Sequence, residues 1–291
     1  MMDKDIFSVV GKTAIVTGAS SGLGAAFAQI LASRGANVVL AARRTDRLQE
    51  LAERIARDGG TALPIACDVA ESAQVKNMVA TAWDRFGRVD ILVANAGQIA
   101  DGGPAPERLP EALFNQVIQV NLTGVWLCYQ EVGARMLRDG KGGSLIGIAS
   151  IWGLSGQMQG PVAYQASKAA VINMTRALAL SWADRGVRVN AIAPGNFYTE
   201  MSAPFFDDPA CLRYFESRNP MGRVGNPEEL AGALLLLASD ASSYMTGATI
   251  PVDGGYNAGT GAPRMPDEVF QLFEDAAPDG LGRRIMPGDT T

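Results

Sequence analysis

Short apolar runs rich in β-branched residues alternate with longer helical patterns along most of this chain, and that alternation restricts its fold most strongly. The runs are apolar throughout, which is typical of strands covered on both faces of a parallel sheet. Strands and helices in this order form right-handed β-α units. The seven predicted strands are Ala14–Thr17, Asn37–Ala41, Ala62–Ala66, Ile91–Ala94, Ser144–Ala149, Val187–Ala193 and Thr249–Val252.

Helical patterns fill most of the intervals between these strands, and glycine or proline marks several of their ends. Residues 1–256 are therefore expected to form one α/β domain, a doubly wound, mostly parallel seven-stranded Rossmann-type sheet with helices on both faces. Residues 196–223 and the C-terminal extension 257–291 show no clear period and are expected to be surface loop. The predicted helices are Leu23–Arg34, Arg47–Asp58, Ala73–Phe86, Pro110–Arg138, Ala163–Asp184 and Pro227–Leu237.

The composition excludes several classes of function. The chain contains no histidine, which excludes histidine acid–base catalysis, the Ser-His-Asp triad and histidine-ligated metal sites. Its formal net charge of −5 does not provide the basic face that nucleic acids need, so no nucleic-acid partner is expected. Cys67, Cys128 and Cys211 are odd in number and far apart, which favours free thiols in a reducing compartment and no zinc site.

The N-terminus lacks the apolar core and cleavage site of a signal peptide. The longest apolar run, Leu230–Ala238, is about half of the ~20 residues that span a bilayer, so it is expected to be a buried helix. No membrane association is expected, and the chain is predicted to be cytoplasmic.

The first predicted strand runs directly into a glycine-rich loop that opens a helix. A pyrophosphate needs backbone N–H donors at a helix N-terminus and no Cβ where the chain approaches it. Gly18 is expected to make the tight turn, Gly22 to allow the close approach, and Gly24 to let the helix pack on the strand. A plain glycine turn is the alternative, but the position between strand and helix favours a dinucleotide. The loop reads Thr17-Gly18-Ala19-Ser20-Ser21-Gly22-Leu23-Gly24.

A second pattern, Tyr164-Gln165-Ala166-Ser167-Lys168, places a phenol and an ammonium on one face of a predicted helix. A neighbouring ammonium favours the phenolate, so Lys168 is expected to lower the pKa of Tyr164 towards neutral pH. Tyr164 is then a candidate general acid–base in a chain without histidine. Taken alone, such a pair is most often a surface coincidence.

Several separated motifs in a fixed order indicate more than any one of them. Together they resemble the short-chain dehydrogenase/reductase family, in the branch with a Thr-Gly-x-x-x-Gly-x-Gly opening and among its 3-oxoacyl reductase and ketoreductase-like members. The resemblance covers roughly Gly11 to Tyr256. It rests on Thr17–Gly24, Asp68-Val69, Asn95-Ala96-Gly97, Asn121, Ser150-Ile151-Trp152-Gly153, Tyr164, Lys168, Arg188-Val189-Asn190, Pro194-Gly195, Gly247 and Val252-Asp253-Gly254-Gly255.

The resemblance implies four catalytic residues. Tyr164 exchanges a proton with the substrate oxygen while hydride passes at the nicotinamide, and Lys168 lowers its pKa and holds the nicotinamide ribose. Ser150 donates a hydrogen bond to the substrate carbonyl. Asn121 holds a water that links Lys168 to solvent. Ser155 is a competing hydroxyl, because the interval between Ser150 and Tyr164 is slightly longer than is usual in the family.

Other matches to the family imply contacts with the dinucleotide. Asp68 and Val69 bind the adenine edge, and Asn95-Ala96-Gly97 passes beneath the adenine ribose. Pro194-Gly195 lies against the nicotinamide, and Thr199 reaches its carboxamide or the pyrophosphate. Plain turns are the alternative for the two glycine-containing segments, but both follow strands, and sheets of this kind bind ligands at the C-terminal strand ends.

The end of the second predicted strand bears on the choice between NADP(H) and NAD(H). An aspartate there accepts hydrogen bonds from the adenosine 2′-hydroxyl and repels a 2′-phosphate. Here Arg43 and Arg44 follow the strand, and no carboxylate occurs before Asp46. A guanidinium suits a phosphate dianion, and Ser20 and Ser21 add hydroxyl donors. NADP(H) is therefore favoured, with NAD(H) as the alternative.

In the family the segment at 196–223, here called the lid, closes over the substrate. Its aromatic and apolar side chains favour an apolar or bulky small-molecule carbonyl, such as a 3-oxoacyl, ring or aryl ketone, or the matching alcohol. The alternatives are a sugar-acid or polyol dehydrogenase, a non-catalytic NADP(H)-sensing protein, and an epimerase or dehydratase with internal hydride transfer. The candidate substrate residues are Trp152, Met158, Phe197, Met201 and Phe205.

A homotetramer is expected from the resemblance and from the apolar helices at Val171–Leu180 and Leu230–Ala238, which carry more apolar surface than one face needs. Full coverage of both helices within the monomer is the alternative. In the extension, the acidic Pro266–Glu268 precedes an apolar stripe, Val269–Phe273. A helix at Asp267–Ala276 that docks near the substrate entrance is predicted, with a disordered tail as the alternative.

Overall fold

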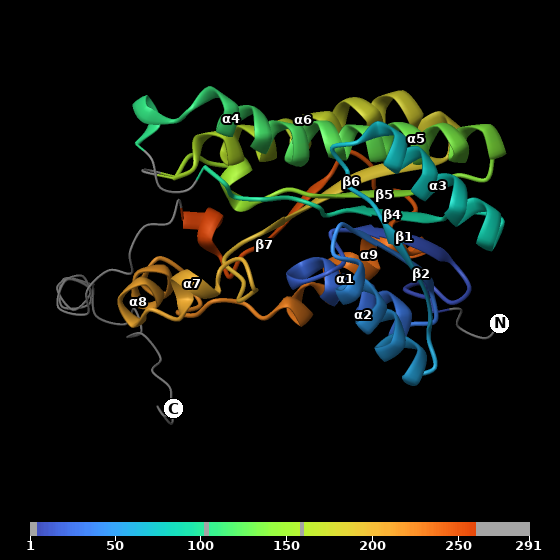
Figure 1. The fold of residues 1–291 in the computed structure, drawn as a ribbon, viewed down its shortest axis with the longest axis horizontal. Helices are drawn as coiled ribbons and strands as arrows, with labels where there is room; N and C mark the ends of the chain where they lie inside the picture. The colour runs from blue at the N-terminus through green and yellow to red at the C-terminus, as the bar shows by residue number, and fades with distance from the viewer. Residues whose placement is uncertain (1–4, 102–104, 158–159, 260–291) are drawn as a thin grey trace, which may run out of the picture.

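The computed structural model describes residues 5–101, 105–157 and 160–259, and seven parallel strands form one sheet within them (Figure 1). Their order across the sheet is β3-β2-β1-β4-β5-β6-β7. The α/β fold class predicted from the sequence is confirmed. The strands are β1 (Thr13–Thr17), β2 (Asn37–Ala42), β3 (Thr61–Ala66), β4 (Ile91–Ala94), β5 (Gly143–Ile148), β6 (Val187–Pro194) and β7 (Thr249–Val252).

Helices cover both faces of the sheet (Figure 1). The layer drawn above the sheet contains α3, α4, α5 and α6, and the layer below contains α1, α2 and α9. The helices are α1 (Gly22–Ser33), α2 (Thr45–Arg57), α3 (Ser72–Phe86), α4 (Glu111–Ile118), α5 (Gly124–Asp139), α6 (Val162–Trp182), α7 (Ala203–Phe206), α8 (Pro209–Ser217) and α9 (Ala231–Ala238).

The two layers explain why the strands are apolar throughout. Side chains of a strand point alternately to opposite faces. Val16 therefore belongs to the same core cluster as Phe27 of α1, whereas its neighbour Ile15 belongs to the other cluster, with Val79 of α3. All five residues of β1 are buried. A strand with helices on both sides has no solvent face on which a polar residue is needed.

The chain order reverses at β1, which pairs with β2 on one side and β4 on the other. Crevices at such a reversal lie outside the carboxyl ends of the strands and are the usual ligand sites of these sheets. The glycine loop 18–24 follows β1, and residues 95–97 follow β4. The fold thus brings two of the predicted motifs to one edge.

The predicted helix at Pro110–Arg138 is divided by an irregular turn. It contains α4, a π-helical turn at Gln119–Thr123 and α5, and the three segments follow each other without a break. A π turn holds one more residue than an α-helical turn. A hydrophobic period of 3.6 residues does not reveal such an insertion, so the sequence predicted one regular helix.

The prediction of surface loop for the lid is wrong for part of it, because the lid contains α7 and α8. Asp208 caps α8: its carboxylate accepts hydrogen bonds from the backbone of Ala210 at 2.9 Å and of Cys211 at 2.8 Å. Pro209 occupies the first helical position, where its missing N–H costs nothing. The Asp-Pro pair was a start signal that the aromatic composition obscured.

The predicted surplus of apolar surface on α6 and α9 is largely absent. Most of their apolar side chains are covered within the chain, as the alternative interpretation held, and Leu180 at 87% exposure is the clear exception on α6. The buried residues of the two helices include Val171, Ile172, Ala179, Leu234, Leu235 and Leu237.

None of the helices in the described ranges is long and apolar enough to cross a membrane. Two predictions lie outside the described residues and have no structural counterpart: the helix at Asp267–Ala276 and the substrate residue Met158.

Candidate active site

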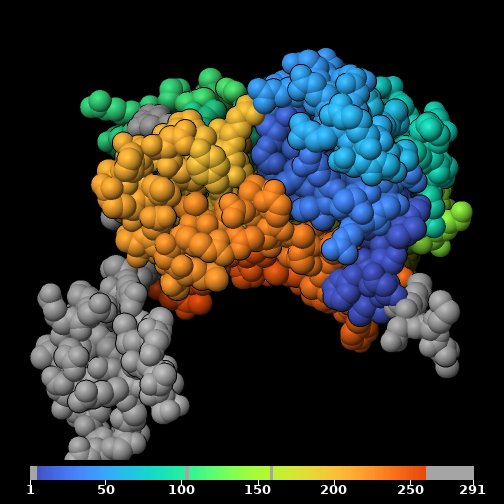
Figure 2. Space-filling view, turned by 90° about the horizontal axis from the view of Figure 1, so that it is seen from below, coloured from blue at the N-terminus to red at the C-terminus, as the bar shows by residue number. Residues whose placement is uncertain are grey.

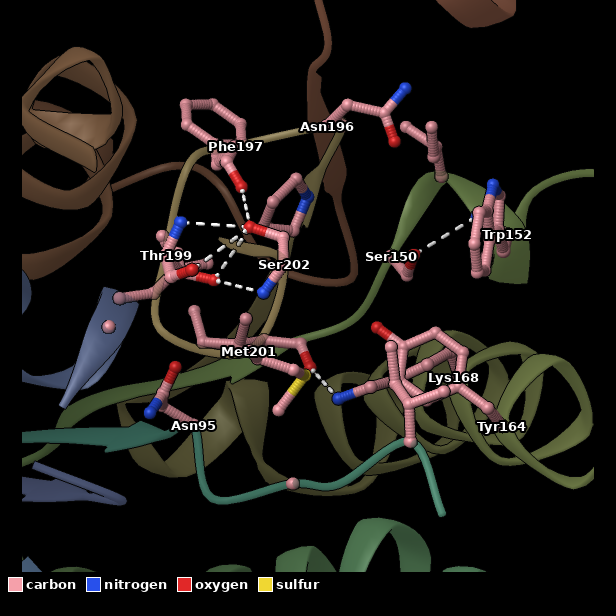
Figure 3. Close-up of a pocket in the computed structure, with 18 of the residues that line it drawn as sticks. Asn95, Ser150, Trp152, Tyr164, Lys168, Asn196, Phe197, Thr199, Met201 and Ser202 are labelled. Atoms are coloured by element: carbon pink, nitrogen blue, oxygen red, sulfur yellow. Dashed lines mark hydrogen bonds between the residues drawn. The ribbon is translucent and has the colours of Figure 1, made fainter. Parts of the chain in front are cut away.

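A pocket opens at the carboxyl ends of the strands, between the glycine loop and the lid. Figure 3 shows Ser150, Tyr164 and Lys168 on one side of it and Thr199 and Ser202 on the other. Its wall is formed by the glycine loop, the ends of β4, β5 and β6, the first turns of α6 and the lid. Three of the four predicted catalytic residues therefore line one cavity.

Tyr164 and Lys168 lie on successive turns of α6, as their spacing predicted. The Lys168 ammonium donates a hydrogen bond to the backbone carbonyl of Ile148 at 2.7 Å. It lies 5.6 Å from the centre of the Tyr164 ring. The contact between the two side chains is thus to the ring face, while the hydrogen bond of Lys168 goes to the end of β5.

Ser150 lies two residues after the end of β5 and is almost completely buried. Its hydroxyl accepts a hydrogen bond from the backbone of Trp152 at 3.1 Å, which closes a short helical turn after the strand. The competing hydroxyl of Ser155 donates instead to Asn257 at 3.0 Å and does not line the pocket. Of the two serines, the structure places Ser150 beside Tyr164.

The π turn holds Asn121 with no exposed surface. The side-chain oxygen of Asn121 accepts from the backbone of Gln98 at 2.9 Å, and its amide donates to the Gln98 carbonyl at 2.9 Å. A Cβ on Gly97 would lie 3.4 Å from that oxygen and 3.5 Å from the Lys168 nitrogen. Asn121 and Lys168 thus approach the same stretch of backbone. The water predicted between them stays a prediction.

The pKa values of the site differ from the sequence-based expectation. Burial raises the pKa of Tyr164, a hydrogen bond with Ser150 opposes this, and the charge of Asp101 raises it further. Burial lowers the pKa of Lys168 to about 8. The pKa of Tyr164 thus lies above its ordinary value and not below it as expected, because loss of water outweighs the hydrogen bond with Ser150. Tyr164 is protonated at neutral pH and able to donate a proton.

The glycine loop has no room for side chains where it passes the end of β4. A Cβ on Gly24 would lie 2.2 Å from the Gly18 carbonyl oxygen, and one on Gly18 would lie 2.9 Å from the Cα of Ala96. Gly18 and Gly22 both have positive φ, at 69° and 53°. Ser21 precedes α1 without capping it through its side chain. The first N–H groups of α1 are thus left for a pyrophosphate at the pocket edge.

A hydrogen-bond network fixes the end of β4 to the end of β1. The Thr17 hydroxyl accepts from the backbone of Asn95 at 3.0 Å and of Ala96 at 3.1 Å. The Asn95 amide donates in turn to the Thr17 carbonyl at 2.9 Å. The motif at 95–97 is therefore more than a plain turn, because its first side chain fastens two strands together.

A second, adjoining pocket contains the residues predicted to bind adenosine. Arg43 is 72% exposed in its side chain and lies 3.9 Å from Asp68, whereas Arg44 contacts the hydroxyls of Ser20 and Ser21. The cavity thus has a polar, cationic wall that suits a ribose or its phosphate. It is lined by Gly18, Ser20, Ser21, Ala42, Arg43, Arg44, Cys67, Asp68, Val69, Ala96, Gly97, Gln98 and Val120.

The described substrate candidates lie in the first pocket, together with the nicotinamide candidates Pro194, Gly195 and Thr199. Trp152 meets the Tyr164 ring edge-to-face at 6.0 Å between centroids. Further lining residues come from the ends of β4 and β5 and from the lid, and two of them, Phe206 and Phe215, are lid aromatics that the sequence had indicated. The substrate candidates are Trp152, Phe197, Met201 and Phe205, and the lining residues that the sequence did not propose for the substrate are Ile99, Ile148, Ala149, Ile151, Asn196 and Ser202.

The known proteins that this chain resembles are dehydrogenases and reductases. A family model described as enoyl-(acyl carrier protein) reductase matches residues 18–257. The cis-4-hydroxycyclohexanecarboxylate dehydrogenase of Sinomonas cyclohexanicum is 41% identical over 85% of this chain and 97% of its own. A short-chain type dehydrogenase/reductase from Mycobacterium marinum has a solved structure with a TM-score of 0.82, 43% identity, and coverage of 87% of this chain and 98% of that one.

The chain belongs to the short-chain dehydrogenase/reductase family. It is accordingly an oxidoreductase that acts on alcohols and ketones with a nicotinamide cofactor. A structure titled as a putative 2-deoxy-D-gluconate 3-dehydrogenase from Agrobacterium tumefaciens with bound NADP is 38% identical, with a TM-score of 0.81 over 88% of this chain and all of that one. The glycine loop, the uncapped start of α1 and the cationic second pocket fit such a cofactor.

Asp101 supports the helix start that carries Tyr164, the candidate acid–base, and was not predicted from the sequence. Its side chain, 2% exposed, accepts hydrogen bonds from the backbone of Ala163 at 2.7 Å and of Tyr164 at 3.2 Å. α6 begins after Pro161, whose side chain cannot cap it. Asp101 thus serves as a cap from a distant loop, and no local pattern links positions so far apart in the chain.

Asp101→Ala is expected to leave two buried N–H groups unpaired and to lower the stability by about 1–3 kcal/mol. It should also reduce kcat, because the first turn of α6 carries Tyr164. Asp101→Asn keeps an acceptor oxygen and should retain most of both properties. Thermal unfolding and steady-state kinetics on the two variants test this, and equal behaviour of Asp101→Ala and the parent would contradict it.

Proposed function

We propose that this enzyme reduces a neutral, apolar or ring-shaped ketone to a secondary alcohol, or runs the reverse reaction, with NADP(H) as the favoured cofactor. The observation that supports this most is the meeting of Ser150, Tyr164 and Lys168 in an apolar cavity beside the glycine loop. Burial raises the pKa of Tyr164, so its hydroxyl carries the proton that reduction of a ketone requires.

The residues divide the chemistry between them. When bound, the nicotinamide cofactor supplies hydride to the carbonyl carbon in reduction, or accepts it in oxidation. Tyr164 donates its hydroxyl proton to the carbonyl oxygen, and Ser150 hydrogen-bonds that oxygen while negative charge develops on it. Lys168 returns a proton towards Tyr164 and holds the ribose of the cofactor. Asn121 holds the water through which Lys168 exchanges protons with solvent.

The lining of the pocket supports a neutral substrate. Among the described lining residues Lys168 alone is charged, and its ammonium is already bonded to the Ile148 carbonyl. A carboxylate-bearing substrate would meet no arginine there to pair with. The aromatic wall from Trp152, Phe197 and Phe205 instead offers contact area to a ring or an acyl chain.

A sugar-acid or polyol dehydrogenase is the second candidate, favoured by the names of relatives. One solved structure, 35% identical, is a gluconate 5-dehydrogenase from Burkholderia cenocepacia in complex with NADP and tartrate. A curated relative at 39% identity is a D-threitol dehydrogenase from Mycolicibacterium smegmatis. Asn196, Thr199 and Ser202 are polar lid residues in the pocket, and such groups suit hydroxyl-rich substrates.

A substrate panel distinguishes these functions, read as NADPH absorbance at 340 nm. Ring ketones, aryl ketones and 3-oxoacyl thioesters are expected to exceed gluconate-type acids and polyols in kcat/KM by about tenfold or more. With the best substrate, Tyr164→Phe should lose nearly all turnover while its Kd for cofactor stays within about twofold. Retention of more than a few per cent of kcat would remove Tyr164 as the acid–base. No turnover by the parent with any compound would favour the sensing protein.

NADPH is expected to bind more tightly than NADH, because guanidinium groups and no carboxylate directly follow β2. Arg43→Asp should reverse the order, since a carboxylate accepts from a 2′-hydroxyl and repels a 2′-phosphate. Titration of nicotinamide fluorescence gives all four dissociation constants. Equal constants for the two cofactors in the parent would contradict the preference.

We also propose that the protein is a homotetramer. The family supports this assembly, whereas the expected surplus of apolar surface is absent from α9, whose apolar side chains are mostly covered within the chain. The exposed Leu180 on α6 and Trp126 on α5, which is 37% exposed, remain as apolar groups for contact between copies. Light scattering at micromolar concentration is expected to report four copies. A Leu180→Glu variant should then dissociate, and a monomeric parent would exclude the assembly.

A further inference from the structure

The lid contributes one carboxylate to the edge of the adenosine pocket. Glu200 uses both its oxygens there: one pairs with Arg44 at 2.8 Å and the other with Arg47 at 2.8 Å. The hydrogen bond from Arg44 holds the pKa of Glu200 below its usual range, so the group is an anion at neutral pH. Figure 2 shows the yellow lid segment meeting the blue segment that contains the first two helices.

Arg44 connects this carboxylate to the glycine loop. Its Nε and one Nη lie 3.2 Å and 3.1 Å from the Ser20 hydroxyl, and the same Nη lies 2.5 Å from the hydroxyl of Ser21. Ser20, Ser21 and Arg44 all line the adenosine pocket. The guanidinium is thus held between the cofactor loop on one side and the lid on the other.

A carboxylate bonded to Arg44 occupies a cationic group of the pocket that a phosphate would use, and its second bond, to Arg47, holds it there. We propose that Glu200 is a specificity-determining residue, because its carboxylate competes with an adenosine 2′-phosphate for Arg44. The residue thereby weakens NADP(H) relative to NAD(H). A 2′-hydroxyl is neutral and does not compete, so NAD(H) leaves the contact between lid and arginines intact.

This inference rests on the proposed binding of the dinucleotide in the second pocket, and it limits rather than removes the preference for NADP(H). The side chain of Arg43 is more exposed than that of Arg44, at 72% against 42%, and is 3.9 Å from Asp68, so it is better placed to meet a phosphate. Glu200 is itself about half exposed, at 49%. Exposed ion pairs are weak enough for a bound phosphate to displace one of them.

Glu200→Gln removes the charge and keeps the shape of the side chain. The expected result is a Kd for NADPH that falls about fivefold, with the Kd for NADH changed less than twofold. Glu216→Gln is the matched control, because Glu216 is a lid carboxylate on α8 that lines neither pocket. It should change neither constant. In an Arg44→Gln background, Glu200→Gln should lose most of its effect on NADPH.

Three results would overturn the proposal: an unchanged ratio of the two constants in Glu200→Gln, the same shift in Glu216→Gln, and equal weakening of both cofactors, which indicates that Glu200 only supports the lid. A parent that binds neither dinucleotide would remove the proposed function as well. A parent that binds both, with no change of ratio in Glu200→Gln, would remove this inference alone.

Discussion

Everything at the site depends on how closely the loop after β1 approaches the end of β4. Thr17 and Asn95 are hydrogen-bonded to each other, and Gly18 and Gly24 are packed with no space for a Cβ. That approach sets the mouth of the pocket, directs the start of α1 towards it and fixes the backbone at Gly97, which Asn121 and Lys168 face. A side chain at Gly24 would displace these groups together, because the backbone it meets cannot move aside cheaply.

The candidate catalytic side chains show how burial and hydrogen bonding oppose each other. Tyr164 and Lys168 were chosen from the sequence for their spacing, and α6 places them as expected. The direction of the Tyr164 pKa was not predictable from spacing, since it depends on how much water the lid and the neighbouring strands exclude. Burial favours the neutral form of both side chains, since it raises the pKa of Tyr164 and lowers that of Lys168 to about 8.

The strands were predictable to within a residue or two. A short run such as Ile91–Ala94, which is apolar at every position, is typical of a strand that helices cover on both faces. The glycine loop was predictable for a similar reason, since few chemical needs require three glycines between a strand and a helix. The sequence did not predict contacts between side chains that are far apart along the chain. Asp101 reaches the start of α6, and Glu200 reaches Arg44, across intervals in which no periodic pattern connects the partners.

The π turn at Gln119–Thr123 also sets the rotation of one helix relative to its continuation. Each residue in a helix advances it by about 100° around the axis. The extra residue therefore rotates α5 about the helix axis relative to α4. The two helices contact different neighbours, since α4 packs on α6 and α5 packs on α3. Deleting one residue there would restore α-helical geometry but rotate the buried face of α5, which includes Tyr129 and Val132, relative to the sheet. The π turn thus lets α4 contact α6, the helix of Tyr164 and Lys168, while α5 buries its apolar side chains in the core.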